Sequence, residues 1–344
     1  MKKTIAMVIL LATMSILLSG CDDRANTSST KGYQLSAWTT YWDYKNVPNE
    51  INILGDNLTE IVYFGAYFDQ SNHLFIPKET QRTFQEIKNM PDSLRYKNYL
   101  AIVNDKVNSK GKTSLKSRDL LYELFANEKS VDQHINDIVN LACEGGYDGV
   151  EIDYEAIKGT DLWHMYLNFT SRLYQKLKEH NLKMRIDLES SAPINKLKFP
   201  EGPEYVMMCY NLYGADSKPG PKADKKFLQA MADKMAALPG KKSLAIATGG
   251  FDWSENGKVE DITEQEADSL LKKYSIIPQR DSEKSNALTF KYSDQSGLKH
   301  QVWFADGLTL SSWITTIKNK GDFYISLWRL NGNNKDSLKL LSNS

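Results

Sequence analysis

The segment 146–155, GYDGVEIDYE, places carboxylates at alternate positions. Glu151, Asp153 and Glu155 would share one face of a β-strand, because successive side chains of a strand point to opposite faces. The residues between them are apolar or aromatic and would form the other face. An acidic strand face either meets water or does chemistry, since a buried carboxylate must be paired, hydrogen-bonded or protonated. Neighbouring carboxyls also raise each other's pKa, which suits a general acid that works near neutral pH.

The rest of the chain predicts the elements that would hold this segment. Apolar runs that predict strands lie at 34–42, 58–68, 99–105, 147–155, 182–191, 205–213, 242–251 and 322–330. Amphipathic helical patterns lie between several of these runs. The alternation predicts an α/β fold, a (β/α)8 TIM barrel that occupies residues 32–344. We expect a small α+β insertion between strands 7 and 8, at about 254–300, where a helix pattern precedes a hairpin pattern.

The topology of a parallel barrel determines whether the acidic face meets water. Helices cover the outer face of each strand and side chains fill the inside, so neither face meets water. The three acids would then point into the barrel, with Glu155 at the C-terminal ends of the strands, where barrel enzymes carry their reacting groups. Asp148 faces the other way, and the sequence leaves open whether it supports the strand or the site. A second acidic pair, at 187 and 189, could line the same cleft or could pair with the arginine at 185.

Several motifs resemble those of glycoside hydrolase family 18, the chitinases and their relatives. The run 148–155 is similar to the family's D-G-x-D-x-D-x-E signature, with Glu151 where the family has Asp. The run 208–211 is similar to its M-x-Y-D motif, with Asn211 in place of the acid. Trp328 matches the tryptophan of barrel strand 8, and the run 302–328 resembles the segment that leads into that strand. The resemblance extends over nearly the whole chain that follows residue 31.

The resemblance implies a retaining hydrolase that cuts β-1,4 bonds next to N-acetylglucosamine by substrate-assisted catalysis. Glu155 would be the general acid, Asp153 would orient the acetamido group of the sugar, and Tyr210 would hydrogen-bond its oxygen. The remaining residues of the implied substrate site are Glu151, Asn211, Trp328, Tyr41, Trp42 and Met208. The polymer stays open between chitin, an N-glycan and peptidoglycan. The run 210–221 is more similar to cell-wall and spore-related members than to secreted chitin degraders.

Two other functions remain open at this point. A non-catalytic chitinase-like lectin would bind the same sugars without cutting them; such relatives generally lack the acid at the position of Glu155, which this chain keeps. An unrelated barrel hydrolase that uses two protein carboxylates would also cut sugars that lack the acetamido group.

The first residues predict export and lipid anchoring. Lys2 and Lys3 precede an apolar stretch of signal-peptide length, and the ending Leu-Ser-Gly-Cys resembles the lipobox of bacterial lipoproteins. We therefore expect a signal peptide at 1–20, lipidation at Cys21 and a flexible tether at 21–31, which would hold the protein on a membrane of a bacterial cell envelope.

Composition limits the other partners. The chain has 43 basic and 43 acidic residues, so it lacks the positive field that nucleic acid requires. The five histidines are scattered without metal-ligand spacing, and we expect no metal, no cofactor and a monomer. We expect Cys143 and Cys209 to be buried thiols and Trp38, Trp163 and Trp313 to be core residues. The sequence leaves open whether Trp42 and Trp253 stack on sugars.

Overall fold

The computed structural model describes residues 34–91, 96–108 and 110–342. The expected signal peptide, Cys21 and the tether lie outside the described residues. Within the described residues, no helix is long and apolar enough to cross a membrane.

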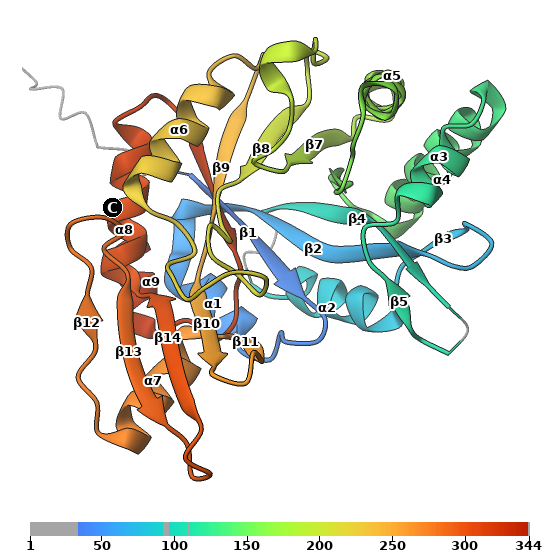
Figure 1. The fold of residues 1–344 in the computed structure, drawn as a ribbon. Coiled ribbons are helices and arrows are strands. Elements are labelled where there is room, and N and C mark those ends of the chain that lie inside the picture. The colour runs from blue at the N-terminus through green and yellow to red at the C-terminus, as the bar shows by residue number, and fades with distance from the viewer. Residues whose placement is uncertain (1–33, 92–95, 109, 343–344) are drawn as a thin grey trace, which may run out of the picture. The chain divides into compact units, whose positions relative to one another are not determined.

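Eight parallel strands form a closed barrel, as predicted (Figure 1). In chain order they are β1 (Leu35–Thr40), β2 (Leu58–Phe68), β4 (Lys97–Val107), β6 (Gly149–Asp153), β7 (Lys183–Leu188), β8 (Glu204–Met208), β9 (Lys242–Ala247) and β15 (Tyr324–Trp328). The barrel closes because β1 pairs with β2 on one side and with β15 on the other.

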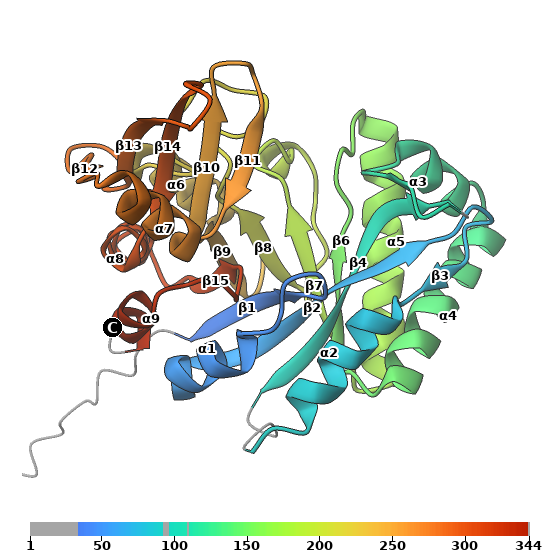
Figure 2. The ribbon, with the colours of Figure 1, turned by 90° about the horizontal axis from the view of Figure 1, so that it is seen from below.

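Helices surround the barrel on its outer side (Figure 2). They are α1 (Val47–Leu54), α2 (Lys78–Lys88), α3 (Arg118–Leu124), α4 (Glu128–Gly145), α5 (Thr160–Glu179), α6 (Lys225–Met235), α8 (Gly307–Lys318) and α9 (Lys335–Ser342), with 3-10 turns at Gly55–Asn57 and Ile194–Lys196. Helix α4 shows why they form where they do. Asn127 caps its start through a capping box, Gly146 ends it in a left-handed conformation, and its apolar stripe is buried against the barrel.

A second sheet occupies the connection between the seventh strand, β9, and the eighth, β15. It contains β10 (Gly249–Ser254), β11 (Val259–Ile262), β12 (Gln279–Arg280), β13 (Leu288–Ser293) and β14 (Lys299–Ala305), together with α7 (Glu264–Tyr274). The sheet starts earlier and ends later than the expected 254–300. The run 242–251, expected as one strand, is divided between the two sheets. Gly249 turns the chain there with φ +60, and a Cβ at this position would lie 2.3 Å from the carbonyl oxygen of Ile262.

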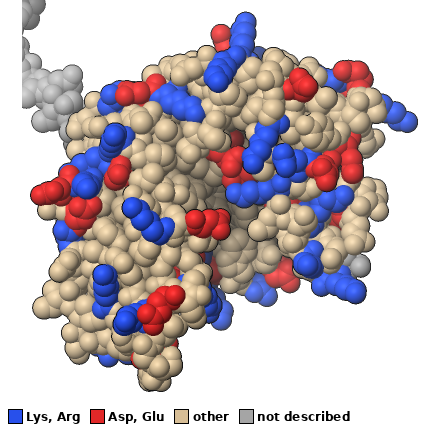
Figure 3. Space-filling model, viewed as in Figure 1, with Lys and Arg blue, Asp and Glu red and all other residues tan. Residues whose placement is uncertain are grey.

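Two short strands extend the barrel at the C-terminal ends of its strands. They are β3 (Leu74–Phe75), paired with the end of β2, and β5 (Thr113–Ser114), paired with the end of β4. The hairpin of β4 and β5 reaches beyond the barrel before the chain enters α3. Figure 3 shows that this face of the molecule is hollowed, with acidic and basic side chains at the rim of the hollow.

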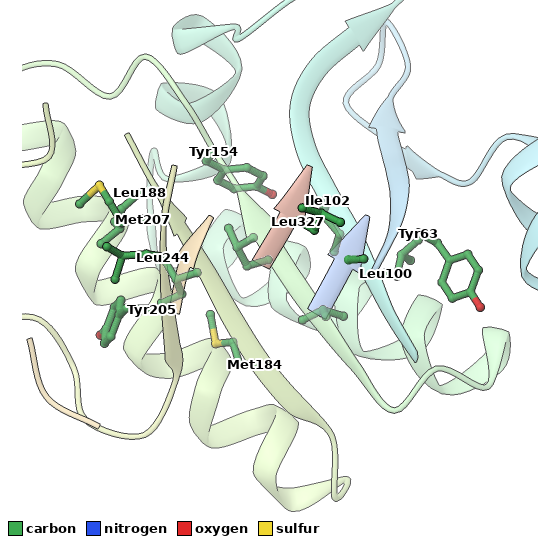
Figure 4. Packing of buried hydrophobic residues seen from close by; sticks show 14 of the residues in the cluster. Tyr63, Leu100, Ile102, Tyr154, Met184, Leu188, Tyr205, Met207, Leu244 and Leu327 are labelled. Atoms are coloured by element: carbon green, nitrogen blue, oxygen red, sulfur yellow. The ribbon is translucent and has the colours of Figure 1, made fainter. Parts of the chain in front are cut away.

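Alternation along the strands separates the apolar core of the barrel into two parts, and a third buried cluster lies in the second sheet. Outward-facing side chains such as Leu100, Ile102, Tyr205 and Met207 pack beneath the helices in one large cluster (Figure 4). Inward-facing side chains, including Trp38, Val62, Tyr99 and Val206, form a smaller cluster inside the barrel, with Tyr210 and Trp328 packed against it.

The predictions about individual core residues are confirmed with one exception. Trp38, Trp163, Trp313 and Cys209 are buried. Cys143 is exposed, so the prediction of a buried thiol was wrong there. Its neighbour on α4, Ala142, belongs to the buried stripe, and one residue turns a helix by about 100°, which carries the Cys143 side chain off that stripe.

Candidate active site

A cavity of about 520 Å³ opens at the C-terminal ends of the barrel strands. Its walls come from β1, β2, β4, β6 and β15 and from the segment that follows β5. The side chains that carry its chemistry are Tyr41, Trp42, Phe64, Tyr67, Asn104, Asp105, Lys116, Asp153, Glu155 and Trp328. Asp153 and Glu155, the predicted pair, thus lie in one cavity.

Glu155 lies two residues beyond the end of β6, and the neighbouring strand β4 holds its backbone. The Glu155 N–H donates to Asn104 Oδ1 at 2.9 Å, and Asn104 Nδ2 donates to the Glu155 carbonyl oxygen at 3.1 Å. The next residue, Ala156, has φ +58 and donates its N–H to Glu189 at 2.9 Å. These contacts fix the turn that presents the Glu155 carboxyl to the cavity. Sequence reasoning missed Asn104, because nothing in its own strand pattern indicates a partner in the next strand.

Asp153 is the last residue of β6 and is almost completely buried. Burial raises the pKa of Asp153 well above its usual range, and the carboxyls of Glu155 and Glu151 add to this effect. Its Oδ1 atom is buried without a hydrogen-bond partner among the described residues. Since a buried polar atom without a partner is costly, this oxygen is available to a group that enters the cavity.

Lys116 contacts the predicted acid directly, and sequence reasoning missed it. Its Nζ lies 2.5 Å from Glu155 Oε2. Burial raises the pKa of Glu155, and the Lys116 ammonium opposes that rise without cancelling it. For Lys116 burial lowers the pKa, but the carboxylates of Glu155, Glu189 and Asp153 together outweigh this effect and the net shift is upward. The two residues are 39 positions apart, so no local pattern could have paired them.

Glu151 is fully buried inside the barrel, below the cavity. Its two carboxylate oxygens have separate partners: Trp38 Nε1 at 2.5 Å and Arg185 Nε at 2.7 Å. Arg185 also contacts Glu60 at 2.5 Å and Glu204 at 3.4 Å. The extra methylene of Glu151 therefore reaches a buried arginine, and the residue is close to the site without lining its wall.

Asp187 completes the buried acids of the barrel. Burial raises the pKa of Asp187 well above its usual range, and the charges of Glu151 and Asp153 add to this. Its Oδ1 atom is also buried without a hydrogen-bond partner in the part of the chain that the structure describes. Arg185 does not form an ion pair with Asp187. Its short contacts are to Glu60 and Glu151.

Aromatic rings surround the acids. The rings of Trp328 and Tyr210 are nearly parallel, at an interplanar angle of 20° and a centroid distance of 6.4 Å. Phe64 meets Trp328 edge-on at 5.3 Å and Trp42 at 5.7 Å. Trp42 is 52% exposed and lines the cavity with Tyr41. Flat apolar rings beside polar groups are the surface that a sugar ring, with one apolar face and equatorial hydroxyls, can stack on.

Other predicted residues lie outside the cavity wall. Met208 ends β8, half-buried, and Asn211 follows it, exposed and with φ +57. Asp148 lies at the opposite end of β6, where it accepts the Asn98 N–H at 2.9 Å and thereby supports strand pairing. Trp253 is buried in β10 and donates to the Gly214 carbonyl at 3.3 Å, so it does not face the cavity.

A closed (β/α)8 barrel with paired buried acids and aromatic rings at the ends of its strands defines a class of protein, the barrel glycosidases. The chain belongs to one of their families: the sequence model of Glycosyl hydrolases family 18 matches residues 37–333. The protein is therefore a glycoside hydrolase of that family, as its motifs predict.

Comparisons with individual proteins agree with this membership. The chain is 27% identical over 236 residues to the uncharacterized glycosylase YvbX of Bacillus subtilis. The matched region covers 64% of this chain and 67% of YvbX. It is 25% identical over 235 residues to the cortical fragment-lytic enzyme of Bacillus anthracis, covering 62% of this chain and about half, 53%, of that one. The crystal structure of a chitinase from Chromobacterium violaceum has the same fold, with a TM-score of 0.75 at 17% identity, over 91% of this chain and 98% of that one.

Proposed function

We propose that this glycosidase cuts β-1,4 bonds next to N-acetylglucosamine and that the acetamido oxygen of the substrate is the nucleophile. The observation that carries the proposal is the pair at the end of β6. Glu155 presents a carboxyl to the cavity, and beside it Asp153 keeps a buried oxygen without a partner. That oxygen suits a short-range polar contact with the acetamido N–H of a sugar.

In the first step Glu155 gives its proton to the glycosidic oxygen and the bond from that oxygen to the anomeric carbon breaks. The acetamido oxygen forms a new bond to the anomeric carbon, which yields an oxazolinium ion. The positive charge that develops on the acetamido group favours the ionised form of Asp153, which gives its proton to solvent, accepts the acetamido N–H and stabilises that charge. Water then attacks the anomeric carbon, gives its proton to Glu155 and reopens the ring with retained configuration. Tyr210 would position the acetamido oxygen, and Trp328 would support the sugar ring.

The test is Glu155→Gln, assayed on chitin oligomers and on purified peptidoglycan. The amide keeps the shape of the side chain but cannot give up a proton, so we expect kcat to fall by about 10² to 10⁴. Binding of the oligomer should persist. Glu79→Gln, on the exposed side of α2, is the matched control. Retained turnover by the Glu155→Gln variant would show that Glu155 is not the general acid.

A thiazoline analogue of the oxazolinium ion separates this mechanism from one with two protein carboxylates. We expect the analogue to inhibit the wild-type protein, because it occupies the place of the intermediate. Cleavage of sugars without an acetamido group, together with indifference to the analogue, would favour the other mechanism.

Two further parts of the proposal concern the polymer and the location. The relative named a cortical fragment-lytic enzyme favours peptidoglycan over chitin and N-glycans. We also propose that the protein is exported and anchored to a membrane by lipid at Cys21. Cys21→Ala should abolish incorporation of labelled fatty acid and release the protein from the membrane fraction; unchanged labelling would exclude this anchor.

A further inference from the structure

The ion pair between Lys116 and Glu155 conflicts with the chemistry of a general acid. A general acid must hold a proton, and a cation 2.5 Å away favours the ionised carboxylate. The other ionisable groups around Glu155 are the carboxyls of Asp153 on β6, Asp105 on β4 and Glu189 after β7. All of these favour the protonated form of Glu155, and Lys116 opposes them. Lys116 therefore reduces the fraction of Glu155 that holds a proton, and a group that draws the ammonium away would increase that fraction.

The backbone of Lys116 is held so that its side chain reaches this position. Lys116 follows β5 with φ +52, and its N–H donates to Asp105 Oδ1 at 2.7 Å. The next N–H, of Ser117, donates to the Asn104 carbonyl at 2.8 Å. Both contacts come from the end of β4, the strand that also brackets the backbone of Glu155. The side chain itself is about half exposed, at 47%, so the ammonium can exchange one partner for another without crossing the core.

The position of Glu155 indicates which group of a bound substrate could pair with the Lys116 ammonium in place of the Glu155 carboxylate. The proton of a general acid goes to the leaving oxygen, which in a β-1,4 glycan is O4 of the sugar on the leaving-group side. A substituent on O3 of that sugar is attached to the neighbouring carbon and so lies beside Glu155, where the ammonium of Lys116 is. A hydroxyl cannot compete with a carboxylate for an ammonium, whereas a carboxylate on O3 can. Muramic acid carries such a carboxylate on its 3-O-lactyl ether.

We propose that Lys116 makes the site selective for glycans that carry a carboxylate on the sugar next to the scissile bond, on its leaving-group side. The substrate carboxylate pairs with the ammonium, so Glu155 loses its cation and takes up a proton from solvent. A larger fraction of the acid is then protonated than when a neutral glycan is bound. Lys116 acts as a specificity-determining residue. This inference rests on the proposed function of Glu155 and narrows its substrate.

The experiment compares two tetrasaccharides, one with alternating N-acetylglucosamine and N-acetylmuramic acid and one with N-acetylglucosamine alone. They differ only in the lactyl ethers. At pH 7 we expect the wild-type kcat/KM to favour the carboxylated substrate about tenfold or more, the effect of about 1.4 kcal/mol. Lys116→Met should remove most of this preference, and Lys116→Arg should retain it. Lys112→Met, exposed on the same hairpin, is the matched control and should leave the preference unchanged.

A second readout separates this role from a structural one. On the neutral tetrasaccharide, Lys116→Met should move the alkaline limb of kcat/KM to higher pH, because Glu155 without its cation keeps its proton longer. A wild-type preference for the neutral substrate, or equal losses on both substrates in Lys116→Met, would overturn the proposal. If Lys116→Met does not fold, reduction of the lactyl carboxyl to an alcohol tests the same contact on the wild-type protein, and an unchanged preference would overturn it. Failure of the wild type to cut either tetrasaccharide would instead count against the proposed function.

Discussion

At the scale of single residues, Glu151 is explained by the two contacts of its carboxylate. One oxygen accepts from Trp38 and the other from Arg185, both at full burial. An aspartate at this position would withdraw the carboxylate by the length of one methylene and could not keep both contacts. Glutamate in place of the family's aspartate is therefore explained by the buried Arg185. This arginine lies directly opposite Glu151 on the adjacent strand β7.

Glu151→Asp should lower the stability of the protein. Loss of one charge-assisted hydrogen bond costs about 1.5–3 kcal/mol, and Arg185 would keep its contacts with Glu60 and Glu204. Glu151→Gln should cost more, about 3–5 kcal/mol, because it removes a buried charge that compensates Arg185. Urea denaturation of the three proteins measures both differences. Equal stability of Glu151→Asp and the wild type would contradict this account of the extra methylene.

At the scale of elements, β4 and the hairpin that it forms with β5 position the acid of β6. Asn104 brackets the backbone of Glu155, Asp105 holds the backbone of Lys116, and Lys116 contacts the Glu155 carboxyl. The catalytic motif is on one strand, but its geometry depends on the next one.

Asn104→Ala should therefore reduce turnover more than binding. A displacement of the Glu155 carboxyl by about 1 Å can cost up to 10² in rate, and we expect kcat to fall about tenfold or more with KM little changed. Kinetics on chitin oligomers measures the two constants separately. Asn140→Ala, exposed on α4, is the control. A rise in KM alone would mean that Asn104 serves substrate binding instead of positioning Glu155.

Periodic patterns predicted the parts of the fold that depend on local sequence. The alternation in 147–155 correctly assigned Glu151 and Asp153 to the inside of the barrel, because pleating allows only two faces. The boundary between β9 and β10 was not predictable from apolar runs, since the apolar run of β9 continues to Phe251 in β10 and only Thr248 and the turn at Gly249 separate the two strands. Lys116 and Asn104 were missed for a different reason: their roles depend on contacts between elements, and an exposed lysine in a polar loop carries no local signal.

At the scale of the whole molecule, the inside of the barrel is a stack of buried charges. Near the N-terminal ends of the strands, Arg185 and Lys241 neutralise Glu60 and Glu204. Towards the cavity, Asp153 and Asp187 have raised pKa values, and neither forms an ion pair with another described residue; Lys116 and Arg185 lower the two pKa values only in part. Ion pairing is therefore more complete for the deeper carboxyls than for Asp153 and Asp187.

Those carboxyls make stability depend on pH. Burial raises the pKa of Asp187 well above the value of about 3.9 expected in the unfolded chain, so over the range between the two values the folded state holds a proton that the unfolded state has lost. Unfolding then releases protons, and the free energy of unfolding falls as pH rises through this range. Below it both states are protonated and the penalty is absent.

Asp187→Asn tests this directly, because the amide imitates the shape and the neutral charge of the protonated acid. We expect the variant to match the wild type in Tm at pH 4.5 and to exceed it by several degrees at pH 8, where the wild type bears the cost of the buried acid. One pKa unit corresponds to about 1.4 kcal/mol, and 1 kcal/mol moves the Tm of a domain of this size by roughly 2 °C. Asp161→Asn, exposed in the first turn of α5, should show no such dependence. A Tm difference between the Asp187 variant and the wild type that stays constant between the two pH values would mean that Asp187 is ionised in the folded protein, contrary to its raised pKa.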